Sequence, residues 1–255
     1  MAGLFQDLFA RRRIRSSARR RRTRLAMESL ESRRCLATVN FFPELGMLAI
    51  DGDGAANDIR IRSTSADDVR VVADGRDYGA FRGIETLRIR TAGGRDFVDV
   101  SLGATFPYLS VALGQGDDRL NVTVADPAGA DPAVDPPEPD RVGRIRIDAG
   151  AGDDFVDVNL GATFPYLSVA LGQGDDRLNV TVADPAGADP AVGDPAVDPP
   201  EPDRVGRIRI DAGAGDDFVK VRLPHDRYFM DIDMGSGDDV LQVIVGDRSK
   251  LGGGR

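Results

Sequence analysis

Residues 97–118 read FVDVSLGATFPYLSVALGQGDD, and this stretch decides the fold. It divides into a six-residue block, a five-residue turn, a second six-residue block and a second five-residue turn, GQGDD. In each block the second, fourth and sixth residues are apolar, as in Val98, Val100 and Leu102. Apolar residues at every second position of a short block bounded by glycine predict a half-buried β-strand. The stretch is therefore expected to form two short strands joined by tight turns.

The second of these turns, which we call the Gly-Asp turn, recurs along the chain. The segment from Phe97 to Val134 is repeated from Phe155 to Val192 with a single substitution. Successive Gly-Asp turns lie 22, 36, 22, 41 and 22 residues apart and end at Asp96, Asp118, Asp154, Asp176, Asp217 and Asp239. The two long intervals contain Pro-rich acidic inserts, 125–143 and 183–206, in place of the other short turn. A fixed 22-residue unit therefore underlies the whole series.

This periodicity predicts an all-β fold. Two strands per unit favour a β-solenoid, a parallel β-helix or β-roll of about 22-residue coils with long Pro-rich loops. An antiparallel β-sandwich of the same strands is the alternative, and it would hold neighbouring Gly-Asp turns about 10 Å apart. The expected domains are a basic, partly helical N-terminal targeting segment (1–38), diverged β rungs (39–96), the β-solenoid (97–249, with Pro-rich loops 125–143 and 183–206) and a flexible tail (250–255).

The composition limits the chemistry that is open to this chain. It contains one Cys and one His, which excludes a disulfide framework, a thiolate cluster and the usual imidazole metal sites. The net charge is −9, but the first 34 residues carry about +8, which leaves about −17 for the remainder. Such an acidic body is expected to attract cations and to repel nucleic acid. Oxygen ligands for cations are therefore the chemistry that remains.

The Gly-Asp turn and the strand after it resemble a known repeat. Leu113 to Asn121 reads LGQGDDRLN, and the same pattern begins at Ala149, Leu171, Ala212 and Met234. This pattern is similar to the nonapeptide G-G-x-G-x-D-x-U-x of hemolysin-type, repeats-in-toxin calcium-binding proteins. Here an apolar residue replaces the first Gly, and the motif comes once per unit. The resemblance implies a β-roll whose turns hold Ca²⁺.

Both residue types of the turn also suit calcium for physical reasons. Glycine permits positive φ and a close approach of backbone carbonyls, and aspartate supplies the hard oxygen that Ca²⁺ prefers. If units stack about 4.8 Å apart, neighbouring carboxylates repel by about 3 kcal/mol at an effective dielectric near 20, and cations relieve this repulsion. The predicted metal ligands are Asp96, Asp117, Asp118, Asp153, Asp154, Asp175, Asp176, Asp216, Asp217, Asp238 and Asp239, with Gly114, Gly116, Gly150, Gly152, Gly172, Gly174, Gly213, Gly215, Gly235 and Gly237.

A metal-free β scaffold is the alternative explanation of the same residues. Gly-Asp pairs make good turns by themselves, and Arg119, Arg144, Arg177 and Arg207 offer charges that neutralise the acid. Paired carboxylates also serve glycoside hydrolysis, but here they recur in phase as scaffold residues do, whereas an active site usually occurs once. The chain is therefore predicted not to be an enzyme.

The N-terminal segment differs in kind from the rest of the chain. A cluster of arginines between Arg11 and Arg24 is followed at 27–37 by MESLESRRCLA. This segment is similar to the Leu-Glu-Pro-Arg-x-Leu-Leu type N-terminal segment of large planctomycete surface and secreted proteins, with Ser32 in place of the Pro. The resemblance implies export from a bacterial cell. The alternative is an uncleaved basic arm that binds nucleic acid or a membrane.

These patterns together predict a calcium-binding structural or adhesive repeat protein that is secreted or held at the cell surface. Its expected partners are calcium ions and components of the cell surface or matrix, and its mature body is not expected to bind nucleic acid. The sequence contains no run of 18 apolar residues, so no transmembrane helix is expected.

Overall fold

A computed structural model describes residues 37–63, 68–103, 108–125, 143–161, 166–183, 206–224 and 228–246. The predicted helical part of the N-terminal segment, most of both Pro-rich inserts and the predicted tail (250–255) lie outside these residues. The chain divides into two compact units, Met1–Arg33 and Arg34–Arg255, and all of the described residues belong to the second.

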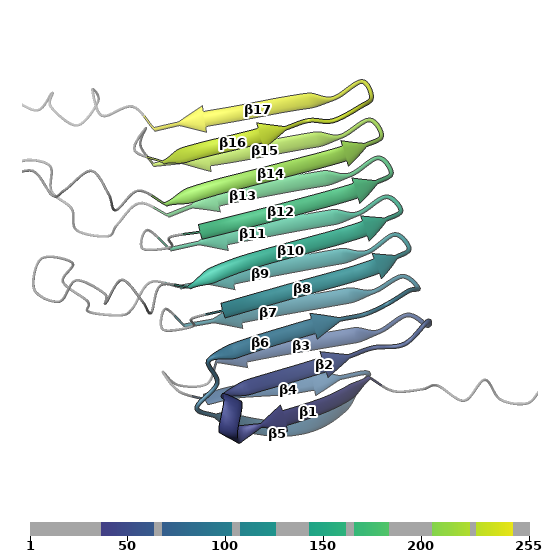
Figure 1. Cartoon of the computed structure of the whole chain (residues 1–255), viewed down its shortest axis with the longest axis vertical. Helices are drawn as coiled ribbons and strands as arrows, with labels where there is room; N and C mark the ends of the chain where they lie inside the picture. Colours follow the sequence, from purple (N-terminus) through teal and green to yellow (C-terminus); the bar gives the residue numbers. More distant parts are fainter. Residues whose placement is uncertain are drawn as a thin grey trace, which may run out of the picture. The chain divides into compact units, whose positions relative to one another are not determined.

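Within that second unit, strands form two sheets, which confirms the all-β prediction (Figure 1). Sheet A contains, in spatial order, β1 (Thr38–Phe42), β2 (Met47–Asp51), β6 (Thr86–Arg90), β8 (Tyr108–Gln115), β10 (Arg144–Ala151), β12 (Tyr166–Gln173), β14 (Arg207–Ala214) and β16 (Phe229–Asp233). Sheet B contains, in spatial order, β17 (Val240–Val245), β15 (Phe218–Leu223), β13 (Arg177–Val182), β11 (Phe155–Leu160), β9 (Arg119–Val124), β7 (Phe97–Leu102), β3 (Asp58–Ser63), β4 (Asp68–Ala73) and β5 (Arg76–Arg82). A 3-10 helix, η1 (Pro43–Leu45), joins β1 to β2.

From β6 onward, successive strands alternate between the two sheets. Each strand pairs in parallel with the strand two places along the chain, and equivalent residues pair: Val156 lies between Leu120 and Leu178. The antiparallel sandwich considered above therefore does not describe this region. The register also holds across both inserts, because β9 pairs with β11 and β13 with β15 at equivalent residues.

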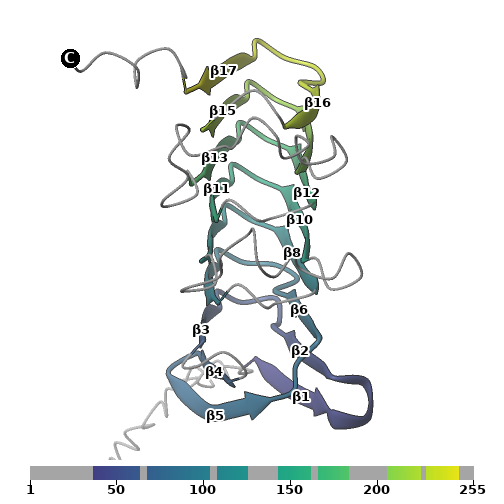
Figure 2. The same ribbon diagram turned by 90° about the vertical axis from the view of Figure 1, so that its left-hand side faces the viewer.

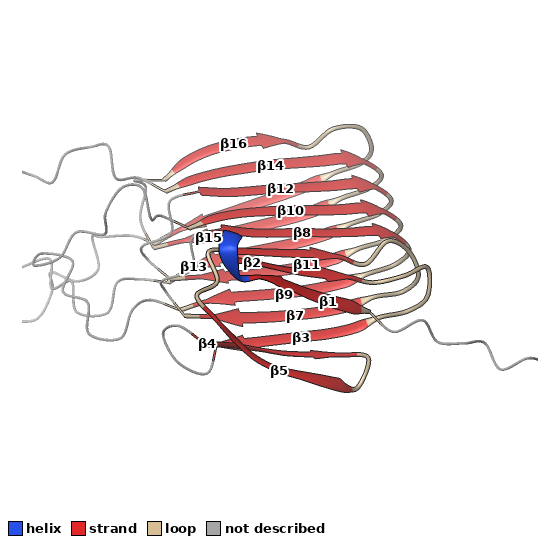
Figure 3. Cartoon of the chain, turned by 60° about the horizontal axis from the view of Figure 1, so that its bottom comes forward, coloured by secondary structure: helices blue, strands red, loops and turns tan. Residues whose placement is uncertain are grey.

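We use the word repeat for one strand of sheet A, the Gly-Asp turn that follows it and the next strand of sheet B. Every Gly-Asp turn leads from sheet A to sheet B. All of these turns therefore lie along the same edge of the molecule, where the strands of sheet A end and the strands of sheet B begin (Figures 1 and 3). This common edge brings turns that are distant in sequence next to each other in space.

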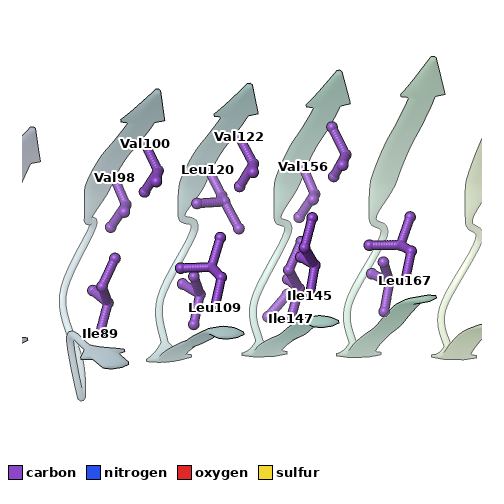
Figure 4. Packing of buried hydrophobic residues seen from close by; sticks show 14 of the residues in the cluster. Ile89, Val98, Val100, Leu109, Leu120, Val122, Ile145, Ile147, Val156 and Leu167 are labelled. Carbon is purple, nitrogen blue, oxygen red and sulfur yellow. The ribbon is translucent and has the colours of Figure 1, made fainter. Parts of the chain in front are cut away.

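The hydrophobic core fills the space between the two sheets. Inward-facing residues at alternate positions are fully buried, as in Val98, Leu120 and Val156 of sheet B. Leu109 and Ile145 of sheet A point toward them from the other side (Figure 4). Full burial of such a side chain stabilises the fold by about 1.5–3 kcal/mol. A register shift by one residue would turn all of these side chains outward, so the apolar alternation fixes the register.

The N-terminal end of the sheets departs from this regular pattern. Residues 39–96 were expected to form diverged rungs, and β2, β3 and β6 do join the parallel pairing. In contrast, β1 pairs antiparallel with β2, and β4 and β5 form an antiparallel extension of sheet B beyond β3. The segment from Asp68 to Gly75, read above as a rung, is thus the start of an antiparallel hairpin.

Candidate functional site: the Gly-Asp turns

The two glycines of each Gly-Asp turn are required by the way the turns stack. Gly172 and Gly174 have φ of 110° and 125°, a region that L side chains rarely adopt. A Cβ atom on Gly174 would lie 2.2 Å from the carbonyl oxygen of Gly152 in the preceding repeat. On Gly172 it would lie 2.0 Å from the carbonyl oxygen of Gly150. Only glycine therefore lets successive turns approach this closely.

The last aspartates of the turns form a column that we call the second-Asp column. Five of its six members are at most 3% exposed, and Asp239 in the last repeat is half-buried. In each case Oδ1 accepts a hydrogen bond from the backbone N–H of the equivalent residue in the preceding repeat. The N···Oδ1 distances are 2.7 Å (Asp96 to Asp118), 2.8 Å (Asp118 to Asp154), 2.8 Å (Asp154 to Asp176), 2.9 Å (Asp176 to Asp217) and 2.9 Å (Asp217 to Asp239).

The second carboxylate oxygen of these residues has no such partner. The Oδ2 atoms of Asp96, Asp118, Asp154, Asp176 and Asp217 are buried and accept no hydrogen bond from the described part of the protein. A buried, unpaired charged oxygen is costly, so each of these groups requires a proton or a cation.

Burial disfavours the charged form of these carboxyl groups. It raises the pKa of Asp118 to about 6 and the pKa values of Asp154 and Asp176 to about 7, against the opposing effect of the backbone N–H bond. Neighbouring carboxylates in the stack raise these pKa values further. Burial also raises the pKa of Asp96 and of Asp217. Near neutral pH Asp154 and Asp176 are therefore only partly ionised unless a cation is present.

The first aspartates of the turns form a separate column with different surroundings. This first-Asp column contains Asp117, Asp153, Asp175, Asp216 and Asp238, and all of its members are exposed. Its hydrogen bonds run the opposite way, since Oδ1 accepts the backbone N–H of the equivalent aspartate in the following repeat in Asp117, Asp153, Asp175 and Asp216. The N···Oδ1 distance is 2.9 Å both from Asp175 to Asp153 and from Asp216 to Asp175. The repeat of Asp96 has Arg95 at this position instead.

Three residues at the N-terminal end of the second-Asp column were missed by the sequence analysis. Asn57 occupies the column position before Asp96, and its backbone N–H donates to Asp96 Oδ1 at 2.7 Å. The amide of Asn57 takes part in hydrogen bonds of its own, accepting from the N–H of Asp53 and donating to Asp74 Oδ2. Asp74 also accepts the backbone N–H of Asp58 at 2.8 Å. The column thus begins with a residue whose side chain is neutral and bonds to Asp53 and Asp74.

The predicted ligand residues therefore lie together, in two parallel columns along one edge. Their donors are all oxygen atoms, the type that Ca²⁺ prefers. Among these oxygen atoms, the buried Oδ2 atoms of the second-Asp column are the ones that have no hydrogen-bond partner. No group of three or more His, Cys, Asp or Glu side chains within the described ranges comes together in a geometry that could hold a metal ion. A cation here would consequently need backbone carbonyls or water as additional ligands.

The chain matches no protein-family model, no curated protein and no solved structure. Across the described strands and turns, no helix is long and apolar enough to cross a membrane.

Proposed function

We propose that this chain is a structural β-solenoid that is exported to the cell surface or the extracellular space and binds calcium at its Gly-Asp turns. The observation that carries this proposal is the series of five buried, partnerless Oδ2 atoms in consecutive repeats. The proposed solenoid is supported by the parallel, in-register pairing of every second strand. Export is supported by the N-terminal segment that resembles those of secreted and surface proteins.

Calcium would act on this edge as a counterion and as a cross-link between repeats. Carboxylates from two neighbouring turns, such as Asp154 and Asp176, would share ions with carbonyl oxygens of the same glycine-rich turns. Binding requires ionised carboxylates, so metal uptake and proton release are coupled. Extracellular modules commonly bind Ca²⁺ with a Kd of about 10⁻⁴–10⁻³ M. The protein would then be loose in a calcium-poor cytoplasm and rigid outside the cell.

The proposal is tested by thermal unfolding of the full chain, followed by circular dichroism, in EDTA, in millimolar Ca²⁺ and in millimolar Mg²⁺. At 10 mM Ca²⁺, a site with a Kd of about 10⁻⁴ M is filled at about a hundred times its Kd, which adds about 2.7 kcal/mol. For a chain of this size each kcal/mol raises the melting temperature by about 2–4 °C. We therefore expect Ca²⁺ to raise the melting temperature by at least about 5 °C and Mg²⁺ to have a much smaller effect. Equal melting temperatures in EDTA and Ca²⁺ would contradict calcium binding.

A metal-free scaffold is the second candidate, and Asn57 favours it. This buried residue takes the column position before Asp96 and has a neutral side chain, and its backbone N–H donates to Asp96 Oδ1 as the backbone N–H groups of the aspartates do to one another. In this case the carboxyl groups would act as proton-bearing hydrogen-bond partners, and the protein would serve as an inert spacer or adhesive scaffold.

The double variant Asp154→Asn/Asp176→Asn separates the two candidates. It keeps an oxygen acceptor for both backbone N–H groups and removes two buried charges. If calcium binds, the variant loses a large part of the Ca²⁺-induced rise in melting temperature. If the scaffold is metal-free, the wild type does not respond to Ca²⁺, and the variant is at least as stable as the wild type. The matched control is Asp148→Asn/Asp211→Asn, two substitutions on the outer face of sheet A.

A further inference from the structure

The two ends of the sheets are finished differently. At the N-terminal end, β1 covers the edge of β2, and the β4–β5 hairpin covers the edge of β3. These added strands also pack against each other, because the Phe41 and Phe81 rings lie 5.5 Å apart between centroids. Tyr78 Oη donates to the carbonyl oxygen of Ala37 at 2.6 Å. The core is therefore covered at this end, where β1 and β5 are the last strands of their sheets.

The C-terminal end has no such cover over its core. In the sheets as described, β16 is the last strand of sheet A and β17 the last of sheet B, so each has a hydrogen-bonded neighbour on one side only (Figure 2). All six residues of β17 are exposed, including Val240 at 52% and Leu241 at 45%. Phe229 of β16 is 59% exposed. The C-terminal end thus has two free strand edges and an exposed apolar layer.

The exposed apolar side chains of β17 continue the inward-facing layer of β15, but no further strand covers them in the described sheets. Leu241, Val243 and Val245 pair with Val219, Val221 and Leu223 of β15, which are at most 4% exposed. Stacked-repeat proteins need end units with a polar outer face to stay soluble, and a long apolar edge strand is a template for pairing with another chain. The protein contains this device at its N-terminal end, so the bare C-terminal end points to a partner.

We propose that this end binds the same end of a second copy of the chain. A suitable partner must offer two free strand edges, one in each sheet, and an apolar layer between them. The C-terminal end of another copy offers all of these, whereas the N-terminal end lacks the exposed apolar layer, because its last strands, β1 and β5, pack against each other over the core. End-to-end pairing therefore buries two apolar layers and closes as a dimer, whereas head-to-tail growth would place each apolar layer against a covered end.

A twofold axis gives this dimer a consistent backbone geometry. Strands β16 and β17 are joined by a Gly-Asp turn and run in opposite directions in the two sheets (Figure 1). A twofold rotation across the end therefore meets each free edge with an antiparallel strand of the other copy. Antiparallel pairing already occurs at the other end of both sheets, in β1 with β2 and β3 with β4. The two apolar layers meet in the middle and extend the core across the contact.

Segments of the same chain suit the C-terminal end less well than a second copy does. Residues 247–255, which follow β17 in the sequence, contain Leu251 as their only large apolar residue, too little to cover the exposed layer. The N-terminal segment contains Leu4, Phe5, Leu8 and Phe9, but a single segment supplies one strand edge and not two. A second copy is the occupant that satisfies both sheets.

The test measures mass and backbone protection of the full chain, in EDTA and in Ca²⁺, by light scattering after gel filtration and by hydrogen exchange. At micromolar concentration we expect a particle of twice the 27.3 kDa chain mass. We also expect amides of β17 to exchange more slowly as the protein concentration rises. The proposal does not depend on calcium binding, so failure of a calcium response leaves it standing.

Two double variants sharpen the test. Val240→Lys/Ile244→Lys places two charges on the outward face of the free edge without entering the core, and should weaken self-association at least tenfold. Thr123→Lys/Thr181→Lys adds the same charge at outward positions of β9 and β13, inside sheet B, and should leave the dimer intact. A monomer with rapidly exchanging β17 amides would overturn the proposal. A monomer whose β17 amides are protected would overturn it too, and would assign the end to a segment of the same chain.

Discussion

The two aspartate columns of the Gly-Asp turns differ in burial although they lie side by side in sequence. Asp176 is fully buried; its Oδ1 accepts the backbone N–H of Asp154 in the preceding repeat, and its Oδ2 has no partner. Asp175 is exposed, and its hydrogen bond runs to the following repeat. The two aspartates of a turn thus link their repeat by hydrogen bonds to both the preceding and the following repeat.

The difference shows where the electrostatic cost of stacking lies. Exposed carboxylates are screened by water and salt, so stacking them costs little. Buried carboxylates lack that screening, and only a proton or a cation relieves them. Variants of the turn should therefore separate what the backbone, the buried column and the exposed column each contribute.

The largest effect is expected from Gly174→Ala, because this change breaks the turn that carries both columns. The new Cβ would lie 2.2 Å from the carbonyl oxygen of Gly152, at a φ of 125°. Positive φ and steric conflict together should cost on the order of 3 kcal/mol or more in the free energy of unfolding. Urea unfolding of the variant and the wild type measures this loss of stability. Gly103→Ala is the control, since Gly103 has no atom within 4 Å of a new Cβ, and it should change stability little.

The next effect compares the columns directly through Asp176→Ala and Asp175→Ala at pH 5. The first change leaves the buried N–H of Asp154 without its acceptor and should cost about 2 kcal/mol. The second frees the N–H of Asp216, which lies in an exposed residue where water replaces the acceptor, and should cost less than about 1 kcal/mol. Chemical unfolding of both variants gives the comparison. Equal losses would show that burial does not distinguish the columns.

The strands and their register were accessible from the sequence because a period of two and regular glycines determine both. The distinction between the two aspartates was also present but was not used. Asp118 has the same parity as the inward residues Leu120 and Val122, whereas Asp117 has the parity of the outward ones. Hydrophobic alternation therefore places the second aspartate inside and the first one outside.

The antiparallel pairing of β1, β4 and β5 at the N-terminal end was harder to predict, since apolar alternation is the same in parallel and antiparallel strands. Asp74-Gly75 carried the missing signal, because both residues adopt positive φ, 51° and 78°, in the turn between β4 and β5. Asp-Gly between two alternating segments is a hairpin signal. Hydrogen bonds of Asn57 were not predictable, because they depend on Asp53 and Asp74 being brought together by the fold.

A further effect is expected from pH in the absence of calcium. Folded-state pKa values of about 7 for Asp154 and Asp176 lie above the value of about 3.9 for an unfolded Asp. The folded chain therefore binds more protons between these values, and its stability should fall as pH rises from about 4 to about 7. In EDTA the contribution of these groups to the fall in melting temperature should be roughly 3 °C or more.

The control for this prediction is Asp154→Asn/Asp176→Asn, which should flatten the pH profile. Saturating Ca²⁺ should also reverse the slope, because metal binding favours the ionised carboxylates. A profile that rises with pH in EDTA for the wild type would mean that the buried column is ionised and paired with groups of the protein.

The smallest effect is expected from Asp175→Asn in EDTA. The amide keeps an oxygen to accept the N–H of Asp216, and the lost charge was exposed, so stability should change by less than about 0.5 kcal/mol. The informative measurement is the same variant in Ca²⁺. If only the buried column binds the ion, the calcium-induced rise in melting temperature stays at its wild-type size. If the rise shrinks as much as in Asp176→Asn, both aspartates of a turn ligate the metal, and the exposed column belongs to the site as much as the buried one.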